Sequence, residues 1–118
     1  MGRQRSGDGV PARKTARMGH VEKTPYQIAT EPGKPHHGWL LAQRELPTVK
    51  LRKAIRSLLK QIAQHEAWIS NPYLKFAANE QPEIIRYHQQ AKWRNDIARQ
   101  REQINILEGV IHERESQK

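Results

Sequence analysis

The residues best suited to chemistry lie in a short stretch in the first half of the chain. It runs from Lys34 to Trp39, reads KPHHGW, and places two adjacent imidazoles beside a cation. In extended chain, neighbouring side chains point in opposite directions, so one histidine can face a substrate while the fold holds the other. Histidine is the usual general acid or base near neutral pH. The stretch therefore predicts a histidine site, and it also fits a surface loop without chemical function.

Cleavage of RNA without a metal needs a base for the 2′-hydroxyl, an acid for the leaving oxygen and a cation for the phosphorane charge. His36 or His37 can act as acid or base, with a second histidine in the other role. Lys34 or Arg44 can supply the cation. His65 is a candidate second histidine if the N-terminal segment folds back over it. It fills the one gap in an apolar helical stripe, where most histidines are hydrogen-bonded structural residues.

Neither a metal nor a cofactor is expected. The chain has no cysteine, and Glu22, Glu45 and Asp96 show no spacing typical of metal ligands. Two-metal nucleases need several converging carboxylates, which this chain does not offer in sequence. A metal-dependent DNase is a further alternative. An HNH-type site would need a β-hairpin before its helix, and the histidine pair ahead of the helix from Thr48 suggests this only faintly.

Composition favours a small helical domain with a polyanionic partner. Of 118 residues only 36% are hydrophobic, the mean hydropathy is −0.94, and 21 Lys and Arg face 12 Asp and Glu, giving a net charge of +9. Such an excess of positive charge favours nucleic acid, and the histidine chemistry favours RNA. No apolar run approaches the roughly 20 residues of a membrane span, so none is expected.

Two stretches carry apolar residues at helical spacing, and the first organises the chain. Its stripe consists of Leu51, Ile55, Leu58, Ile62 and Ile69, with His65 in the gap and with Leu59 and Ala63 expected to widen it. The second consists of Trp93, Ile97, Ile104, Leu107 and Ile111, with Gln100 in the gap. Each stripe needs a partner to bury it. The fold class predicted is mostly α, a long antiparallel helical hairpin with an irregular N-terminal segment packed across it.

Proline, glycine and capping residues set the expected boundaries. Residues 1–19 read as a basic flexible linker and residues 20–118 as one helical domain. Within 20–47 the chain is expected to be irregular and docked through Trp39 and its apolar neighbours, apart from a short helix capped by Thr24. The first arm is expected to begin at Pro47 or Thr48 and to end near Ser70. The second begins at Pro82, and the pattern leaves open whether it bends near Lys92.

Basic residues of both arms could line a groove that follows a phosphate backbone. The candidate nucleic-acid-binding residues are Lys53, Arg56, Lys60, Lys92, Arg94 and Arg99. Trp39 could stack on an unpaired base. The alternative to such a groove is a charged helix face that is simply exposed to solvent. Gly109 is expected to weaken the second arm modestly and to let another backbone approach.

From Gly19 to Glu113 the sequence resembles the C-terminal tip domains of bacterial polymorphic toxins of the Rhs or contact-dependent type. The resemblance is carried by Gly19-His20, Thr24-Pro25, Gly33 to Gly38, Ile55-Arg56-Ser57, Lys60-Gln61-Ile62, His65, Asn71-Pro72, Lys92-Trp93, Asn95-Asp96-Ile97, Arg99-Gln100 and Glu102-Gln103-Ile104. It implies a secreted effector delivered into the cytoplasm of a target bacterium and held harmless at home by a cognate immunity protein.

Two classes of function follow from these observations. The first is an interbacterial toxin that acts as a metal-independent ribonuclease through histidine acid–base chemistry. The second is a non-catalytic basic helical module that binds nucleic acid or a protein. The sequence leaves the oligomeric state open.

Overall fold

The computed structural model describes residues 22–117, and within that range it is built from helices without a strand. The elements are α2 (Pro25–Ala29), α3 (His37–Arg44), α4 (Thr48–Ser70), a 3₁₀ turn (Pro72–Leu74), α5 (Pro82–Tyr87), a π-helical turn (His88–Lys92) and α6 (Trp93–Ser116). None of the helices in this range has the length and apolarity to cross a bilayer. The linker expected over 1–19 lies outside the described residues.

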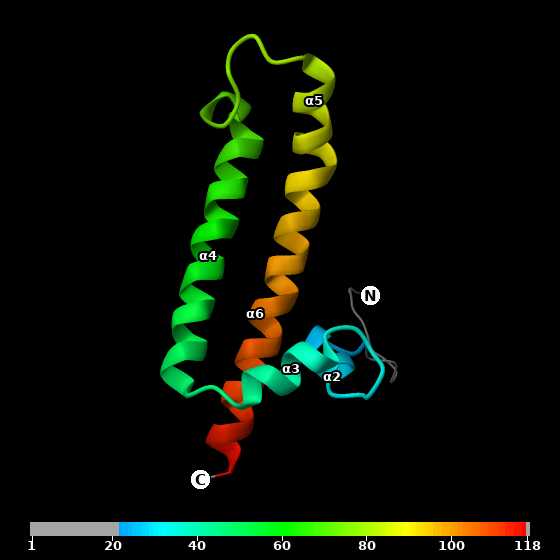
Figure 1. Ribbon diagram of the computed structural model, residues 1–118, viewed down its shortest axis with the longest axis vertical. Helices are drawn as coiled ribbons and strands as arrows, with labels where there is room; N and C mark the ends of the chain where they lie inside the picture. Colours follow the sequence, from blue (N-terminus) through cyan, green and yellow to red (C-terminus); the bar gives the residue numbers. More distant parts are fainter. Residues whose placement is uncertain (1–21, 118) are drawn as a thin grey trace, which may run out of the picture.

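Helices α4 and α6 lie side by side and antiparallel, which confirms the hairpin (Figure 1). The seam between them buries part of the predicted stripes: Leu51 and Ile62 of α4 and Trp93, Ile97, Leu107 and Ile111 of α6. The other predicted stripe residues, Ile55, Leu58, Ile69 and Ile104, are half-buried. The stripe on α4 is narrower than expected. Leu59 is 51% exposed and Ala63 is also exposed, so the prediction that they widen the stripe is wrong.

One polar residue, Gln100, is buried in this seam with 4% of its surface exposed. Its side-chain nitrogen donates to the side-chain oxygen of Gln61 at 3.0 Å. Its own Oε1 has no hydrogen-bond partner among the described residues. Burying an unpaired amide oxygen costs free energy, so this pair interrupts an otherwise apolar interface.

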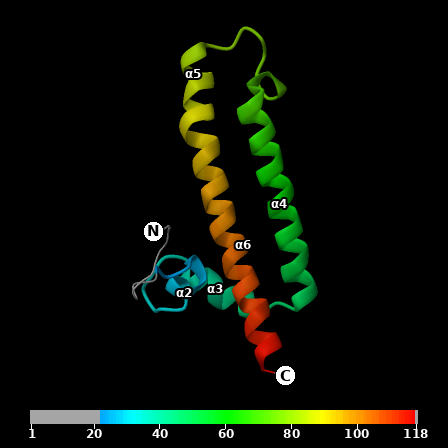
Figure 2. The ribbon, with the colours of Figure 1, turned by 180° about the vertical axis from the view of Figure 1, so that it is seen from behind.

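Helix α6 buries a second face that the single-stripe prediction missed. Ile106 and Val110 are fully buried on it, away from most of the seam with α4. Helix α2 lies on the side of α6 opposite α4, as Figures 1 and 2 show from front and back. The resulting core consists of Ala29, Leu40, Leu51, Ile106, Leu107, Val110 and Ile111, with Tyr26, Trp39, Ala54, Ile55 and Leu58 packed against it. This core lies at the end of the hairpin away from its connecting loop.

Tyr26 attaches α2 to α6. As predicted, Thr24 caps α2, and Gln27 completes a capping box with it. The ring of Tyr26 lies directly over Gly109, where an added Cβ would come within 2.1 Å of the ring. Its main-chain N–H donates to Asn105 at 2.9 Å, and its hydroxyl donates to Glu113. Gly109 therefore admits an aromatic ring, rather than the backbone that its position suggested.

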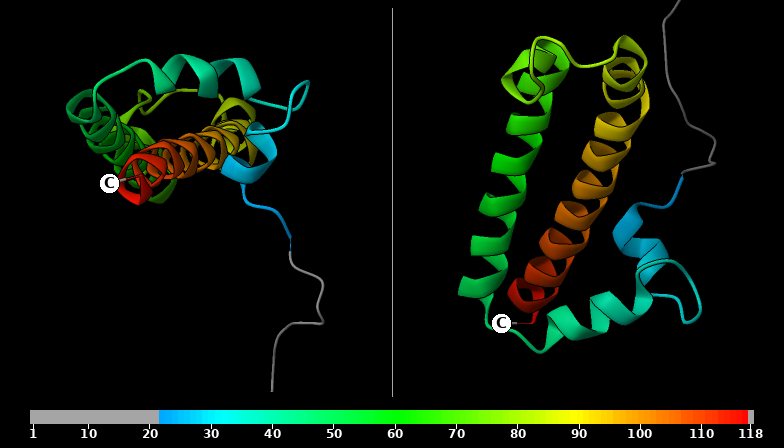
Figure 3. Two further views of the ribbon diagram at one scale, coloured as in Figure 1. Left: turned by 90° about the horizontal axis from the view of Figure 1, so that it is seen from below. Right: turned by 45° about the horizontal axis from the view of Figure 1, so that its top comes forward.

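The segment expected to be irregular contains a second helix, α3, which the sequence analysis missed. It begins after His36, whose left-handed backbone (φ 68°) turns the chain into the helix. Leu40 is fully buried in the core, and this tertiary contact outweighs the local signals from Pro35 and Gly38. Figure 3 shows α3 spanning the end of the hairpin, from α2 to the start of α4. The segment is packed across the hairpin as predicted, but as two helices.

At the other end, helix α5, the π turn and α6 form one continuous helical rod (Figure 1). Near Lys92, where the sequence left a bend open, the rod is continuous and the five residues His88–Lys92 are in π conformation. Insertions of this kind are frequent at functional sites. Trp93 is buried there between the rings of Trp68, Phe76 and His88, with centroid distances of 5.6, 5.7 and 5.4 Å.

Replacement of Gly109 by Ala is expected to lower stability, although helix propensity alone would predict an increase. Propensity alone favours Ala inside a helix by roughly 0.8–1 kcal/mol. The new methyl would displace the ring of Tyr26, because a Cβ there lies 2.1–2.7 Å from three ring atoms. Thermal unfolding should therefore show a lower midpoint for Gly109→Ala.

Gly38→Ala is the matched control, since a Cβ at this helical position meets nothing within 4 Å. It should leave stability unchanged or raise it. In a Tyr26→Ala background the penalty of Gly109→Ala should disappear, and a penalty that persists would rule out the ring contact as its cause.

Replacement of Gln100 by Leu is expected to raise the free energy of unfolding by about 1 kcal/mol, because the unpaired amide oxygen is removed from the seam. Gln61 is exposed and regains water as its partner. Urea denaturation at neutral pH measures the change. A loss of stability would instead assign the Gln61–Gln100 hydrogen bond a net stabilising role.

Candidate nucleic-acid interface

His37 has a structural contact. Its Nδ1–H donates to the carbonyl oxygen of Ala29 at 2.8 Å, and the ring is partly buried. Ala29 is the last residue of α2, where a helix leaves carbonyls without intrahelical partners. The ring therefore ties the start of α3 to the end of α2, as expected for one histidine of an adjacent pair.

His36 is the histidine of the pair that faces a hollow. Its Nε2 lies 3.4 Å from Oε1 of Glu102, and 29% of its side chain is exposed. The hollow has a volume of 320 Å³ and is lined by Lys23, Pro25, Ile28, Pro35, His36 and Glu102. Lys34 lies on the exposed turn before it and does not line the hollow. The charged group that Nε2 contacts is thus a carboxylate, and the cation that lines the hollow is Lys23 rather than the predicted Lys34.

Arg44 lies at the far end of α3 and is held by an acid. Its Nε and Nη2 donate to the two oxygens of Glu113 at 3.1 and 2.7 Å. Burial alone would raise the pKa of Glu113, but hydrogen bonds from Arg44 and Tyr26 outweigh burial and keep that pKa below its ordinary value of 4.5. This bidentate ion pair neutralises the guanidinium and holds α3 against α6.

His65 lies on α4, in a different cluster. Its Nδ1–H donates to the carbonyl of Gln61 at 2.8 Å, while its Nε2 lies 3.6 Å from the carboxylate of Asp96. Lys92 and Arg99 also bind Asp96, at 3.2 and 3.1 Å. Burial opposes ionisation of Asp96, but the hydrogen bonds from Lys92 and Arg99 prevail and lower its pKa below the ordinary 3.8.

The predicted catalytic residues are therefore not brought together. His36 faces Glu102, Arg44 binds Glu113 and His65 approaches Asp96, three separate places along α6. Within residues 22–117, no group of three His, Asp or Glu side chains is arranged to hold a metal ion.

The predicted nucleic-acid-binding residues also divide into groups. Lys92 and Arg99 neutralise Asp96, and Arg94 donates from its Nε to the main-chain oxygen of Gln89 at 3.0 Å. Trp39 packs against the core, which makes it a poor stacking platform. The second arm as a whole is close to neutral, since α6 contains four Arg and five Asp or Glu.

The remaining three residues share one outward face of α4. Lys53, Arg56 and Lys60 lie at spacings of three and four, are exposed, and with Ser57 line a hollow of 320 Å³. None of the three forms an ion pair with another described residue. From Thr48 to His65 the helix has no Asp or Glu but five basic residues: Lys50, Arg52, Lys53, Arg56 and Lys60. We refer to Lys53, Arg56 and Lys60 as the basic face.

The residues that control these groups were not among the predicted site residues. Asp96 and Glu113 neutralise predicted functional cations, and each lies on α6 at positions that periodicity leaves unassigned. Gln89, which orients Arg94, lies in the π turn. The uneven distribution of acids between the arms was visible in the sequence and would have separated α4 from α6.

Comparison of the chain with protein-family models, curated proteins and solved structures finds no match.

Replacement of Asp96 by Asn is expected to lower stability at neutral pH and to flatten its dependence on acid. A carboxyl group whose pKa is lowered by folding stabilises fully above its unfolded value, here near 3.8, and loses this contribution as the pH falls through the folded value. Urea denaturation from about pH 7 to about pH 2.5 measures both effects. Glu108→Gln is the control, because Glu108 is exposed and forms no ion pair with the described residues; parallel curves for Asp96→Asn and the wild type would contradict the assignment.

Proposed function

We propose that this domain binds nucleic acid, with RNA favoured, through the basic face of α4. The observation that supports the proposal is a helix whose first five turns carry five cations and no acid. With one acid in its whole length, α4 accounts for an excess of four positive charges, while α6 has an excess of one negative charge. Most of the positive field of the described hairpin therefore originates from one arm.

Helix stability does not explain this distribution. The start of a helix is the positive end of its dipole and favours acids, yet the first turn of α4 has none and contains Lys50. A row of like charges three and four residues apart is mutually repulsive. A phosphate backbone relieves both effects, because it supplies negative charge along the row and releases counterions.

Replacement of Lys53, Arg56 and Lys60 by Gln is expected to weaken RNA binding strongly and to reduce the slope of log K against log salt by about 2 to 3. Fluorescence anisotropy with a labelled RNA oligonucleotide at several salt concentrations measures both quantities. The matched control replaces Lys23, Lys75 and Arg86, which removes the same charge from elsewhere on the exposed surface. Equal effects of the two triple variants would mean that net charge alone attracts the RNA.

The same samples, incubated with total RNA and with plasmid DNA in the presence and absence of EDTA, distinguish binding from cleavage. A binding module leaves both substrates intact. Metal-independent loss of RNA that disappears with the paired His36→Ala and His37→Ala changes would support the ribonuclease prediction instead. Cleavage of DNA that EDTA abolishes would support the DNase alternative. The toxin role, the delivery route and the immunity partner stay predictions from the sequence resemblance.

A further inference from the structure

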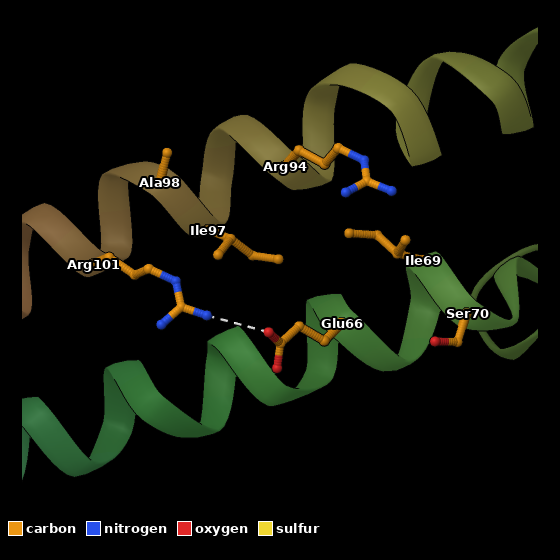
Figure 4. Close-up of a pocket in the computed structure, with 7 residues that line it drawn as sticks. All are labelled: Glu66, Ile69, Ser70, Arg94, Ile97, Ala98 and Arg101. Carbon is orange, nitrogen blue, oxygen red and sulfur yellow. Dashed lines mark hydrogen bonds and ion pairs between the residues drawn. The ribbon is translucent and has the colours of Figure 1, made fainter. Parts of the chain in front are cut away.

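A second arginine-bearing groove lies between α4 and α6, about three helical turns along α4 from the middle of the basic face. It has a volume of 480 Å³ and is lined by Glu66, Ile69, Ser70, Arg94, Ile97, Ala98 and Arg101. Figure 4 shows Ile69 and Ile97 projecting into the space between the helices, with Arg94 above Ile69. At the other end Arg101 donates to Glu66 across the groove at 3.2 Å. The floor is apolar and its ends are charged.

The π turn holds Arg94 in place. The main-chain oxygen of Gln89 accepts from Nε of Arg94 at 3.0 Å, and the side-chain amide of the same Gln89 donates to the carbonyl of Ile69 at 2.9 Å. Gln89 thus joins the end of α4 to the arginine. With Nε occupied, the two terminal nitrogens of Arg94 keep their donors for a ligand, and no described acid pairs with them. A guanidinium fixed in this way loses little conformational entropy when it binds an anion.

The groove and the basic face lie on adjacent sides of α4, about a third of a turn apart around the helix. A third hollow, on the same side of the hairpin as the Arg94 groove, is lined by Arg52, Ile55, Arg56, Glu108, Ile111, His112 and Glu115. Ile55 and Glu66 are eleven residues apart, about three helical turns, so both hollows open on the same side of α4. Arg56 lines this third hollow and also belongs to the basic face. Arg56 therefore borders both sides of α4, and a strand bound along the basic face would pass over it to reach the side on which Arg94 lies.

We infer that the groove binds one unpaired nucleotide, with its phosphate on Arg94 and its base against Ile69 and Ile97. This inference rests on the proposed nucleic-acid function and specifies single-stranded substrate. A base paired in a duplex cannot reach an apolar floor between helices, whereas a splayed base can lie against apolar side chains. The volume falls within the range of small-ligand sites. A phosphate matches an arginine that lacks an acidic partner.

The test is a methyl-resolved NMR titration of the whole domain with adenosine 5′-monophosphate, adenosine and inorganic phosphate. The nucleotide is expected to shift the methyl signals of Ile69 and Ile97 and to bind more tightly than either fragment. Arg94→Gln should weaken nucleotide binding about tenfold. Arg86→Gln is the matched control, since it removes an exposed arginine of α5 that does not line the groove.

Ala98→Leu is a second variant, because Ala98 is an exposed helical position and a larger side chain there fills the groove without removing Arg94. It should also weaken nucleotide binding. Shifts unaffected by both variants, or an acidic peptide that shifts these methyls while the nucleotide does not, would overturn the inference.

The proposed function and this inference fail separately. The Lys53, Arg56 and Lys60 triple variant should lose affinity for long RNA and retain the mononucleotide titration. Arg94→Gln should lower the preference for single strands over a duplex of the same sequence while retaining most of the salt dependence. A preference that is unchanged in Arg94→Gln contradicts the groove and leaves the basic face standing.

Discussion

The placement of α2 on the hairpin depends on one close contact, the ring of Tyr26 against the bare backbone of Gly109. At this point α6 has no side chain, so an aromatic ring can approach a helix that is already covered by α4 on its other side. The hydroxyl of Tyr26 then reaches Glu113, which also accepts both hydrogen bonds from Arg44. One glycine and one carboxylate on α6 thus position α2 and α3 together, and α6 becomes the central helix of the domain.

The hairpin could be predicted because its information is local and periodic. The stripes on Leu51–Ile69 and Trp93–Ile111 define two helices, and the boundaries Thr48 and Ser70 follow from proline and capping signals. A stripe does not state how many partners a helix has. Ile106 and Val110 lie outside the predicted stripe because they face α2 and α3. Helix α3 was missed for a related reason: the burial of Leu40 decides its conformation, and burial is a property of the assembled fold.

The candidate site could be predicted only as a set of residue types. Histidine, lysine and arginine can act on phosphate wherever they are free, but the partners that occupy them are distant in sequence. His37 binds a carbonyl eight residues away, whereas Arg44 binds an acid 69 residues away. No spacing rule relates such pairs. The three residues expected to act together in the Lys34–Trp39 stretch therefore have separate surroundings: His37 is structural, Lys34 is exposed and His36 faces Glu102.

The two arms of the hairpin differ in how far their charged residues are paired. On α6, nearly equal numbers of acids and bases pair with one another and with α3 and α4, and these pairs fix the geometry of the domain. On α4 no acid stands among the cations over eighteen residues, and of these cations Arg52 alone pairs with a described acid, Glu115 at 3.3 Å, although a helix start and a row of like charges both oppose this arrangement. On α6, Arg94 and Arg114 form no ion pair with a described acid, since Arg94 donates to the main-chain oxygen of Gln89 and Arg114 donates to Thr48 and to the main-chain oxygen of Arg44. Lys53, Arg56 and Lys60 on the basic face and Arg94 in the groove are thus among the cations that no described acid neutralises, and the proposed function assigns them to the phosphates of one flexible polyanion.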